Sequence, residues 1–352
     1  MSYWTTYTII LITGLAIGGG LLACIQRYWK SAILKYLAEN VTIALLSIFI
    51  TFMAAELFFV FFAQTDNLNF TLASKNWFTR YWSVNSMGYR DVEWNPEKIR
   101  HQRKIIILGD SFTAGYGIKN VEDRFSNILG KKLGDDYVVM NVARNGAETP
   151  AQIEMIKAFP YKPDILILQY YINDIQDAAK KKAVDYNPPK LYPWPVFSSL
   201  VQNSYALNFI YWRSVRFGPY IWQGDYLAWA KEAYNNPDIW WFHQQELLTI
   251  YEGALSEKVK LIVVVFPALT DVEGTRPLTA KVVNLYRERG IQTLDIAELV
   301  ENIPPEDLVV SALDSHPNQR LHRQVADMLY EMVIQIEQIE PPQIKSSARD
   351  DF

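Results

Sequence analysis

The first stretch of the chain that could carry out chemistry surrounds Ser111. This serine follows four consecutive apolar residues, Ile105 to Leu108, and then the pair Gly109-Asp110. A short apolar run of this kind is typical of a strand in a buried parallel sheet. Ligands of open parallel α/β sheets bind beyond the carboxyl ends of the strands, so a hydroxyl at this place is well positioned for catalysis. To act as a nucleophile, the serine also needs a histidine base, an acid that orients the base, and donors for an oxyanion.

Candidates for these groups occur farther along the chain. Gly146 follows a second apolar run, and its backbone N–H can approach an oxyanion without an intervening side chain. Asn173 follows a third apolar run and offers a side-chain amide. Near the C-terminus, His316 supplies an imidazole, and Asp314 supplies a carboxylate two residues earlier. The case for catalysis by Ser111 therefore depends on these residues meeting at one edge of the sheet.

With these four blocks, the chain resembles the SGNH (GDSL-type) hydrolase family, which is named after Ser, Gly, Asn and His in blocks of this kind. Ser111, Gly146, Asn173 and His316 occur in that order, and the resemblance covers residues 85–335. It implies a serine esterase or O-acyltransferase. His316 would then take the proton of Ser111 as the serine oxygen attacks an ester carbonyl. The backbone N–H groups of Ser111 and Gly146 and the amide of Asn173 would hold the oxyanion.

The chain departs from the family pattern at two positions. Tyr171 stands where the third block usually begins with glycine, and it either narrows the pocket or packs beside it. Leu313 stands where the family commonly has its acid, three residues before the histidine. Asp314 is our choice for the acid that orients His316, and Asp307 or a backbone carbonyl remains an alternative.

The surrounding pattern predicts the fold that must position these residues. Apolar runs alternate with helical patterns, which indicates an α/β fold with a doubly wound, mostly parallel five-stranded sheet of the SGNH or flavodoxin-like kind. The final helix is expected from Gln319 to Gln335, with His316 on the loop that enters it. The expected strands are Ile105–Leu108, Tyr137–Val142, Ile165–Leu168, Leu261–Phe266 and Ile291–Leu294.

Two apolar segments near the N-terminus, Tyr7–Ile25 and Val41–Ala63, are long enough to cross a membrane as helices. A cleaved signal peptide is disfavoured because Met1–Thr6 contains no Lys or Arg. The loop between the two segments is basic, so the positive-inside rule places it in the cytoplasm. The catalytic domain is therefore expected on the periplasmic or extracellular side.

Glu56 lies inside the second apolar segment, where a carboxylate is costly. Either the helix ends early and leaves Glu56 at the interface, or Glu56 marks contact with a membrane protein partner. Such a partner would bind through helices 7–25 and 41–63. Both readings are open at the level of sequence.

The expected organisation is a membrane anchor (1–63), a polar irregular lead-in (64–103), an SGNH hydrolase-like domain (104–340) and a loose tail (341–352). In the lead-in, we expect a turn at Gly88 and a surface position for Arg90. An insertion at 185–245 is rich in aromatic residues, which either fill a small core or contact a sugar, an acyl chain or the membrane.

Composition excludes several classes of function. The net charge of −4 argues against nucleic acid as a partner, since phosphate binding needs a concentrated basic face. A single cysteine, Cys24, excludes an internal disulfide, and the scattered histidines lack the paired spacing of a zinc site. We expect neither a metal nor a cofactor. Together with the expected membrane attachment, the family resemblance implies cell-envelope esters as substrates, either O-acetyl groups on polysaccharides or lipid acyl chains. The competing class is a non-catalytic SGNH scaffold in a membrane assembly.

Overall fold

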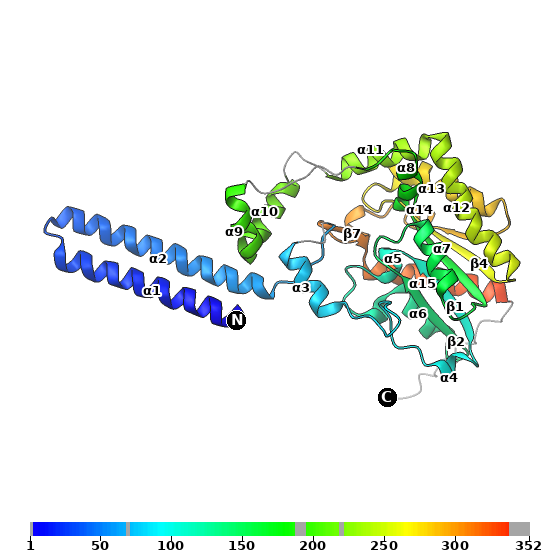
Figure 1. Ribbon diagram of the computed structural model, residues 1–352, viewed down its shortest axis with the longest axis horizontal. Helices are drawn as coiled ribbons and strands as arrows, with labels where there is room; N and C mark the ends of the chain where they lie inside the picture. Colours follow the sequence, from blue (N-terminus) through cyan, green and yellow to red (C-terminus); the bar gives the residue numbers. More distant parts are fainter. Residues whose placement is uncertain (1–2, 68–70, 187–194, 218–221, 338–352) are drawn as a thin grey trace, which may run out of the picture. The chain divides into compact units, whose positions relative to one another are not determined.

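The computed structural model describes residues 3–67, 71–186, 195–217 and 222–337 (Figure 1). The chain divides into two compact units. The helical unit comprises Met1–Gln64, Leu68–Arg80 and Lys190–Ile221, and the sheet unit comprises Thr65–Asn67, Tyr81–Pro189 and Trp222–Phe352. The tail expected at 341–352 lies outside the described residues.

The sheet unit is built on five parallel strands in the order β2-β1-β3-β4-β5. This order confirms the doubly wound α/β fold that the alternating apolar runs predict. Each expected strand is present, with bounds that differ from the expected ones by a few residues. The strands are β1 (Arg103–Gly109), β2 (Tyr137–Ala143), β3 (Ile165–Tyr171), β4 (Lys260–Phe266) and β5 (Gln292–Asp295).

Helices cover both faces of this sheet, which explains why its strands are apolar without alternation (Figure 1). On β1, Ile106 and Leu108 pack into one buried cluster, and Ile105 and Ile107 pack into the other. The first face is covered by α7 (Thr149–Ala158), α11 (Trp222–Asn235), α12 (Pro237–Ser256) and α13 (Val272–Arg287). The second is covered by α6 (Phe125–Leu133) and α15 (Gln319–Glu337).

A second, two-stranded sheet was not expected from the sequence. It pairs β6 (Val309–Ser311) with β7 (Asp314–Pro317) in antiparallel fashion. His316 therefore lies in a short strand, and not in a loop as we had expected. The remaining elements of the sheet unit are short: α4 (Pro96–Ile99), α5 (Ser111–Ala114), α8 (Gln176–Lys181), α14 (Ile296–Leu299) and the 3-10 turns Val121–Asp123, Ile172–Ile175 and Pro305–Asp307.

The stretch from 64 to 103 is not irregular throughout, because it contains α3 (Leu72–Tyr81) and α4. The expected turn at Gly88 is present, with φ of +80°. The surface position expected for Arg90 is wrong: this side chain is 1% exposed. Its guanidinium donates to the carbonyl oxygens of Ala114, Gly115 and Ile118. Burial, together with the nearby charge of Arg124, lowers the pKa of Arg90 to about 9. Arg90 thus secures the loop that follows Ser111.

In the helical unit, α1 (Tyr3–Tyr28) and α2 (Ala32–Phe61) form an antiparallel hairpin, and both are long and apolar enough to cross a bilayer (Figure 1). Gly14 and Gly18 face α2. A Cβ atom would lie 2.4 Å from the Phe49 ring at Gly14 and 2.2 Å from the Leu46 side chain at Gly18. This Gly-xxx-Gly pair therefore serves close packing within the hairpin. Most other apolar side chains of the hairpin are exposed, unlike those of a soluble core helix.

The aromatic-rich insertion is divided between the two units. Two of its helices, α9 (Pro195–Asn203) and α10 (Tyr205–Phe217), belong to the helical unit. The following helices, α11 and α12, pack on the sheet, where Trp229 and Tyr234 are buried. Its aromatic residues therefore do not form one small separate core. Three aromatic residues of the 185–245 range, Tyr192, Trp194 and Tyr220, lie outside the described residues.

The early helix end considered from the sequence is wrong, because α2 does not stop at Glu56. The α2 helix continues to Phe61, and the Glu56 side chain is 2% exposed. Its carboxylate accepts hydrogen bonds from α1 and from the chain that enters α10. The residue is therefore satisfied within the chain, and its burial does not require a partner protein.

Candidate active site

Ser111 lies at the start of α5, directly beyond the carboxyl end of β1. The turn is held by Asp110, whose carboxylate accepts from the backbone N–H of Phe112 at 2.9 Å. Gly109 permits a close approach, because a Cβ atom there would lie 2.4 Å from Oε1 of Gln169. Asp110 therefore serves as scaffolding for the turn. The strand end therefore presents the Ser111 hydroxyl at the rim of the sheet.

The structure brings Ser111, His316 and Asp314 together. Nε2 of His316 lies 2.9 Å from Oγ of Ser111, and Nδ1 of His316 lies 2.6 Å from Oδ1 of Asp314. The same Asp314 oxygen accepts from the backbone N–H of His316 at 3.1 Å. A carboxylate bound to Nδ1 fixes the imidazole so that Nε2 faces the hydroxyl. This hydrogen-bonded chain is the geometry of a serine nucleophile with its base and orienting acid.

The short strand β7 explains how an acid only two residues before the histidine can orient it. Side chains at i and i+2 of a strand point to the same face, which brings the carboxylate of Asp314 to the imidazole of His316. Asp307, the alternative acid, is exposed in a 3-10 turn, and its carbonyl oxygen accepts from Asn318. The carboxylate that accepts from Nδ1 of His316 belongs to Asp314.

The electrostatics of Asp314 suit this arrangement. Burial by itself raises the pKa of the Asp314 carboxyl, but the charge and hydrogen bonds of His316 and a contact with Thr65 outweigh burial and hold the pKa below its ordinary value. The carboxylate is therefore ionised at neutral pH. A buried negative charge at this place would stabilise an imidazolium formed during proton transfer.

Aromatic rings enclose the imidazole and the nucleophile helix. The ring of Tyr116 stacks on His316 with centroids 4.3 Å apart, and its hydroxyl donates to the carbonyl of Asp66 at 2.8 Å. Tyr171, at the position where the family usually has glycine, stacks on Phe112 with centroids 4.2 Å apart. Burial, with a smaller contribution from Asp110, raises the pKa of Tyr171, so its hydroxyl is neutral. Tyr171 thus packs beside the nucleophile helix.

The three candidate oxyanion donors follow the ends of three adjacent strands. The backbone of Ser111 follows β1, Gly146 follows β2, and Asn173 follows β3. Gly146 has φ of +68°, which favours glycine, and the space where a Cβ atom would lie is open. Within the described ranges, neither the Ser111 N–H nor the Gly146 N–H donates to a protein acceptor. Asn173 contacts Asp110, and this contact opposes the rise that burial causes in the Asp110 pKa.

Sequence reasoning missed two supporting residues. Gln169 is buried at the end of β3, where its Oε1 accepts from the backbone N–H of Asp110 at 3.1 Å and from Oγ1 of Thr113 at 2.9 Å. A glutamine directly after an apolar run was a usable signal. Tyr116 carried no comparable signal, because its stacking on His316 depends on residues about 200 positions apart.

Gly117 lies against Asp314, and a side chain at this position would displace the acid. It has φ of +81°, and a Cβ atom there would lie 2.6 Å from Val310 and 2.9 Å from Oδ2 of Asp314. We expect Gly117→Ala to displace the acid and lower kcat about 10- to 100-fold, because a small misplacement of a catalytic group is costly. The matched control is Gly88→Ala, which has φ of +80° and open space around the added methyl group. Equal kcat values in the two variants would contradict this role of Gly117.

His322 has a structural role. Its Nδ1 accepts from the backbone N–H of Phe125 at 3.2 Å, which satisfies a donor at the start of α6. Burial and then the charge of Arg124 lower the pKa of His322 to about 3, so the folded protein holds it neutral.

This lowered pKa predicts a loss of stability in mild acid. The unfolded state binds a proton at His322 below about pH 6.5 and the folded state does not, so stability falls as pH falls through that value. The contribution between pH 7 and pH 5 is about 2 kcal/mol. His322→Asn keeps an acceptor near the Nδ1 position and removes the titration. We expect thermal unfolding of this variant to depend less on pH than that of the wild type; identical dependence would refute the assignment.

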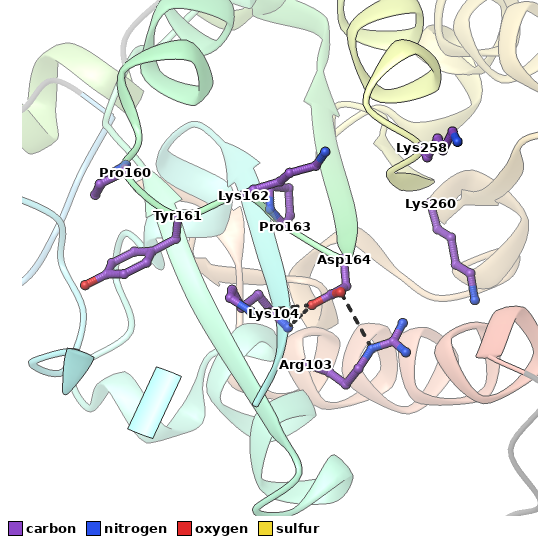
Figure 2. Close-up of a pocket in the computed structure, with 9 residues that line it drawn as sticks. All are labelled: Arg103, Lys104, Pro160, Tyr161, Lys162, Pro163, Asp164, Lys258 and Lys260. Atoms are coloured by element: carbon purple, nitrogen blue, oxygen red, sulfur yellow. Dashed lines mark hydrogen bonds and ion pairs between the residues drawn. The ribbon is translucent and has the colours of Figure 1, made fainter. Parts of the chain in front are cut away.

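A separate pocket of 510 Å³ lies at the opposite, amino ends of the strands (Figure 2). Figure 2 shows Asp164 at its centre, between Arg103 and Lys104. Arg103 also pairs with Glu337 at 2.7 Å, and so does Lys260 at 2.6 Å. Its cations are thus largely paired with carboxylates, and the pocket lies away from Ser111. Among the described residues, no group of His, Cys, Asp and Glu is arranged to hold a metal ion.

Comparison with known proteins agrees with this site. Residues 107–324 match the GDSL-like Lipase/Acylhydrolase family. The match spans more than half of the chain and contains Ser111, Gly146, Asn173 and His316. The chain belongs to this family, whose members are esterases and acylhydrolases.

Solved structures with a similar chain trace include a putative lipolytic protein of the G-D-S-L family from Desulfitobacterium hafniense, with 16% identity, 65% of this chain and 99% of that chain covered, and a TM-score of 0.42. A lipase/acylhydrolase from Enterococcus faecalis has 15% identity and a TM-score of 0.43, and the match covers 69% of this chain and 100% of that chain. An acetyl xylan esterase has 13% identity and a TM-score of 0.41, and the match covers 66% of this chain and 100% of that chain. A search of curated proteins gave no match.

Proposed function

We propose that this protein is a membrane-anchored serine ester hydrolase that works through an acyl-enzyme on Ser111. The observation that carries the proposal is the continuous hydrogen-bonded chain from the Ser111 hydroxyl through His316 to the buried Asp314. A serine that merely caps a helix needs no such partners. These hydrogen bonds therefore favour catalysis over the alternative of a non-catalytic scaffold.

The proposed reaction proceeds in two halves. Ser111 Oγ attacks the ester carbonyl while Nε2 of His316 accepts its proton, and Asp314 stabilises the imidazolium. The N–H groups of Ser111 and Gly146 and the amide of Asn173 hold the oxyanion. Removal of one such donor typically costs about 3–4 kcal/mol of barrier. The leaving alcohol takes the proton from His316. Water, activated by the same imidazole, then releases the acid and restores the serine.

The proposed substrates are esters of the cell envelope, either O-acetyl groups on glycans or acyl chains of lipids. Support comes from the apolar α1–α2 hairpin, whose exposed side chains suit a bilayer. The turn region between its helices contains Arg27, Lys30 and Lys35, so the positive-inside rule puts that end in the cytoplasm. The sheet unit then lies on the periplasmic or extracellular side. An acceptor hydroxyl in place of water would convert hydrolysis into O-acyl transfer by the same acyl-enzyme.

The test uses the full chain in detergent or proteoliposomes. We expect hydrolysis of p-nitrophenyl acetate, and release of acetate from O-acetylated glycan or of fatty acid from envelope lipids. Parallel assays with an added polyol distinguish transfer from hydrolysis, because transfer yields an acylated polyol. Absence of turnover with every ester, in a protein whose fold is intact by circular dichroism, would support the scaffold alternative.

A further inference from the structure

The buried carboxylate of Glu56 organises the start of α10. Its oxygens accept from the backbone N–H groups of Tyr205 at 2.6 Å and Ala206 at 2.9 Å. They also accept from the hydroxyls of Ser204 at 2.9 Å and Tyr7 at 2.7 Å. Ser204 Oγ in turn accepts from the N–H of Leu207 at 3.1 Å. Glu56 therefore caps the helix, and the helix N-terminus stabilises its negative charge.

This cap joins the insertion to the second apolar helix of the hairpin. From Glu56, α10 continues alongside the end of α2, where Phe209 stacks on Phe59 at 4.4 Å and meets Phe62 edge to face at 5.2 Å. The side chain of Asn208 accepts from the N–H of Leu72, the first residue of α3, at 3.0 Å. The contacts extend from Glu56 to Phe62, so α10 packs along the last two turns of α2.

The side of α9–α10 that does not face the hairpin carries large exposed apolar residues. Phe197 is 54% exposed, Leu200 is 55% exposed and Ile210 is 58% exposed. Phe58 and Phe61, on the neighbouring last turns of α2, are also exposed. Phe58 contacts Phe59 and Phe62, and both of these rings contact Phe209, the neighbour of Ile210 on α10. The exposed apolar residues at the end of α2 and on α10 are therefore linked through ring contacts.

We propose that α9–α10 is a second membrane element, a helical hairpin that inserts its apolar face into the interface of the same leaflet in which α2 ends. The inference rests on the proposed membrane anchor. Its occupant is the lipid bilayer, because the exposed apolar residues of α10 are linked through ring contacts to those at the end of α2, and the polar start of α10 is already satisfied by Glu56.

The depth of insertion follows from lengths and polar residues. The 30 residues of α2 extend about 45 Å at 1.5 Å per residue, whereas a hydrocarbon core is about 30 Å thick. Glu56 therefore lies close to the interface. Gln202, Asn203 and Ser214 are polar and exposed, which suits the headgroup region and not the hydrocarbon centre. Tyr211, Trp212 and Arg213 on α10 are residue types that favour this boundary.

The arrangement has a consequence for the proposed enzyme. The α9–α10 segment lies between β3 and β4 of the sheet unit in the sequence, and so both of its ends lead back to that unit. Insertion of this segment would fasten the catalytic fold to the bilayer through its own core connection, in addition to the N-terminal hairpin. Such attachment suits an ester presented at a membrane surface.

Site-specific quenching tests this inference in the full chain. Single cysteines replace Phe197, Leu200 or Ile210 in a Cys24→Ser background, carry an environment-sensitive fluorophore, and are reconstituted in vesicles of phospholipid with or without brominated acyl chains. We expect at least twofold quenching by brominated lipid at these three positions. Gln202→Cys and Ser214→Cys, which are exposed and polar, are the matched controls and should be quenched less.

Two further labels separate the possible failures. Leu45, whose side chain is 60% exposed on α2, is replaced by cysteine to measure whether the anchor itself lies in lipid. Glu154→Cys, at an exposed position of the sheet unit, gives the quenching of a label in water. Quenching at 45 without quenching at 197, 200 and 210 would overturn the inference and leave the anchor intact. Absence of quenching at 45 would overturn the proposed anchor as well. Glu56→Leu should reduce quenching at 200, whereas Glu56→Gln, which retains an acceptor, should reduce it less.

Discussion

Replacement of Ser111 by alanine should abolish ester hydrolysis, with kcat falling about 10⁵- to 10⁶-fold. The reason is that the variant lacks the oxygen that attacks the ester, although the base and the oxyanion donors are still present. A serine hydrolase that loses its nucleophile retains only the modest acceleration supplied by substrate binding and the oxyanion hole. The measurement is initial-rate hydrolysis of p-nitrophenyl acetate by the full chain.

Ser315→Ala is the matched control for this experiment. Ser315 lies next to His316 and its hydroxyl hydrogen-bonds to Asn67, not to the imidazole. We expect its kcat to change by less than about tenfold, because the hydroxyl takes no part in proton transfer. A Ser111→Ala enzyme with a rate close to that of wild type would show that another residue attacks the ester.

The second large effect is expected from His316→Ala. Without Nε2 at 2.9 Å from the hydroxyl, no group in the site can take the serine proton at neutral pH. We expect a loss comparable to that of Ser111→Ala, about 10⁵- to 10⁶-fold, and no additional loss in the double variant, because the two residues act as a unit.

The other histidines supply controls for this result. His101→Ala changes an exposed residue before β1 and should leave the rate within about twofold. His322→Asn tests a buried histidine that the site does not use. Additive losses in the Ser111→Ala/His316→Ala double variant would contradict a shared role in proton transfer.

The parts of the fold that the sequence predicted are those set by local pattern. The five apolar runs were long enough, and apolar enough on both faces, to identify a covered parallel sheet and its ends. Ser111, Gly146 and Asn173 follow three of these ends directly. To predict that these three residues lie at one edge of the sheet, only the positions of the strands and their parallel order were needed.

Other features depended on contacts between distant segments. The surface reading of Arg90 failed because its partners, the carbonyls of Ala114 and Gly115, are presented by a loop whose shape the sequence does not show. The β6–β7 pair is too short to be recognised from periodicity, so His316 was expected in a loop. The internal partners of Glu56 are Tyr7 in α1 and residues about 150 positions away at the start of α10, so no local pattern shows them.

In the proposed mechanism, Ser111 is the residue that forms a covalent acyl-enzyme. Intact mass spectrometry after treatment of the full chain with a fluorophosphonate tests it most directly. We expect one adduct per chain, mapped by peptide sequencing to Ser111, absent in Ser111→Ala and strongly slowed in His316→Ala. No adduct on folded wild-type protein, or an adduct that persists in Ser111→Ala, would contradict it.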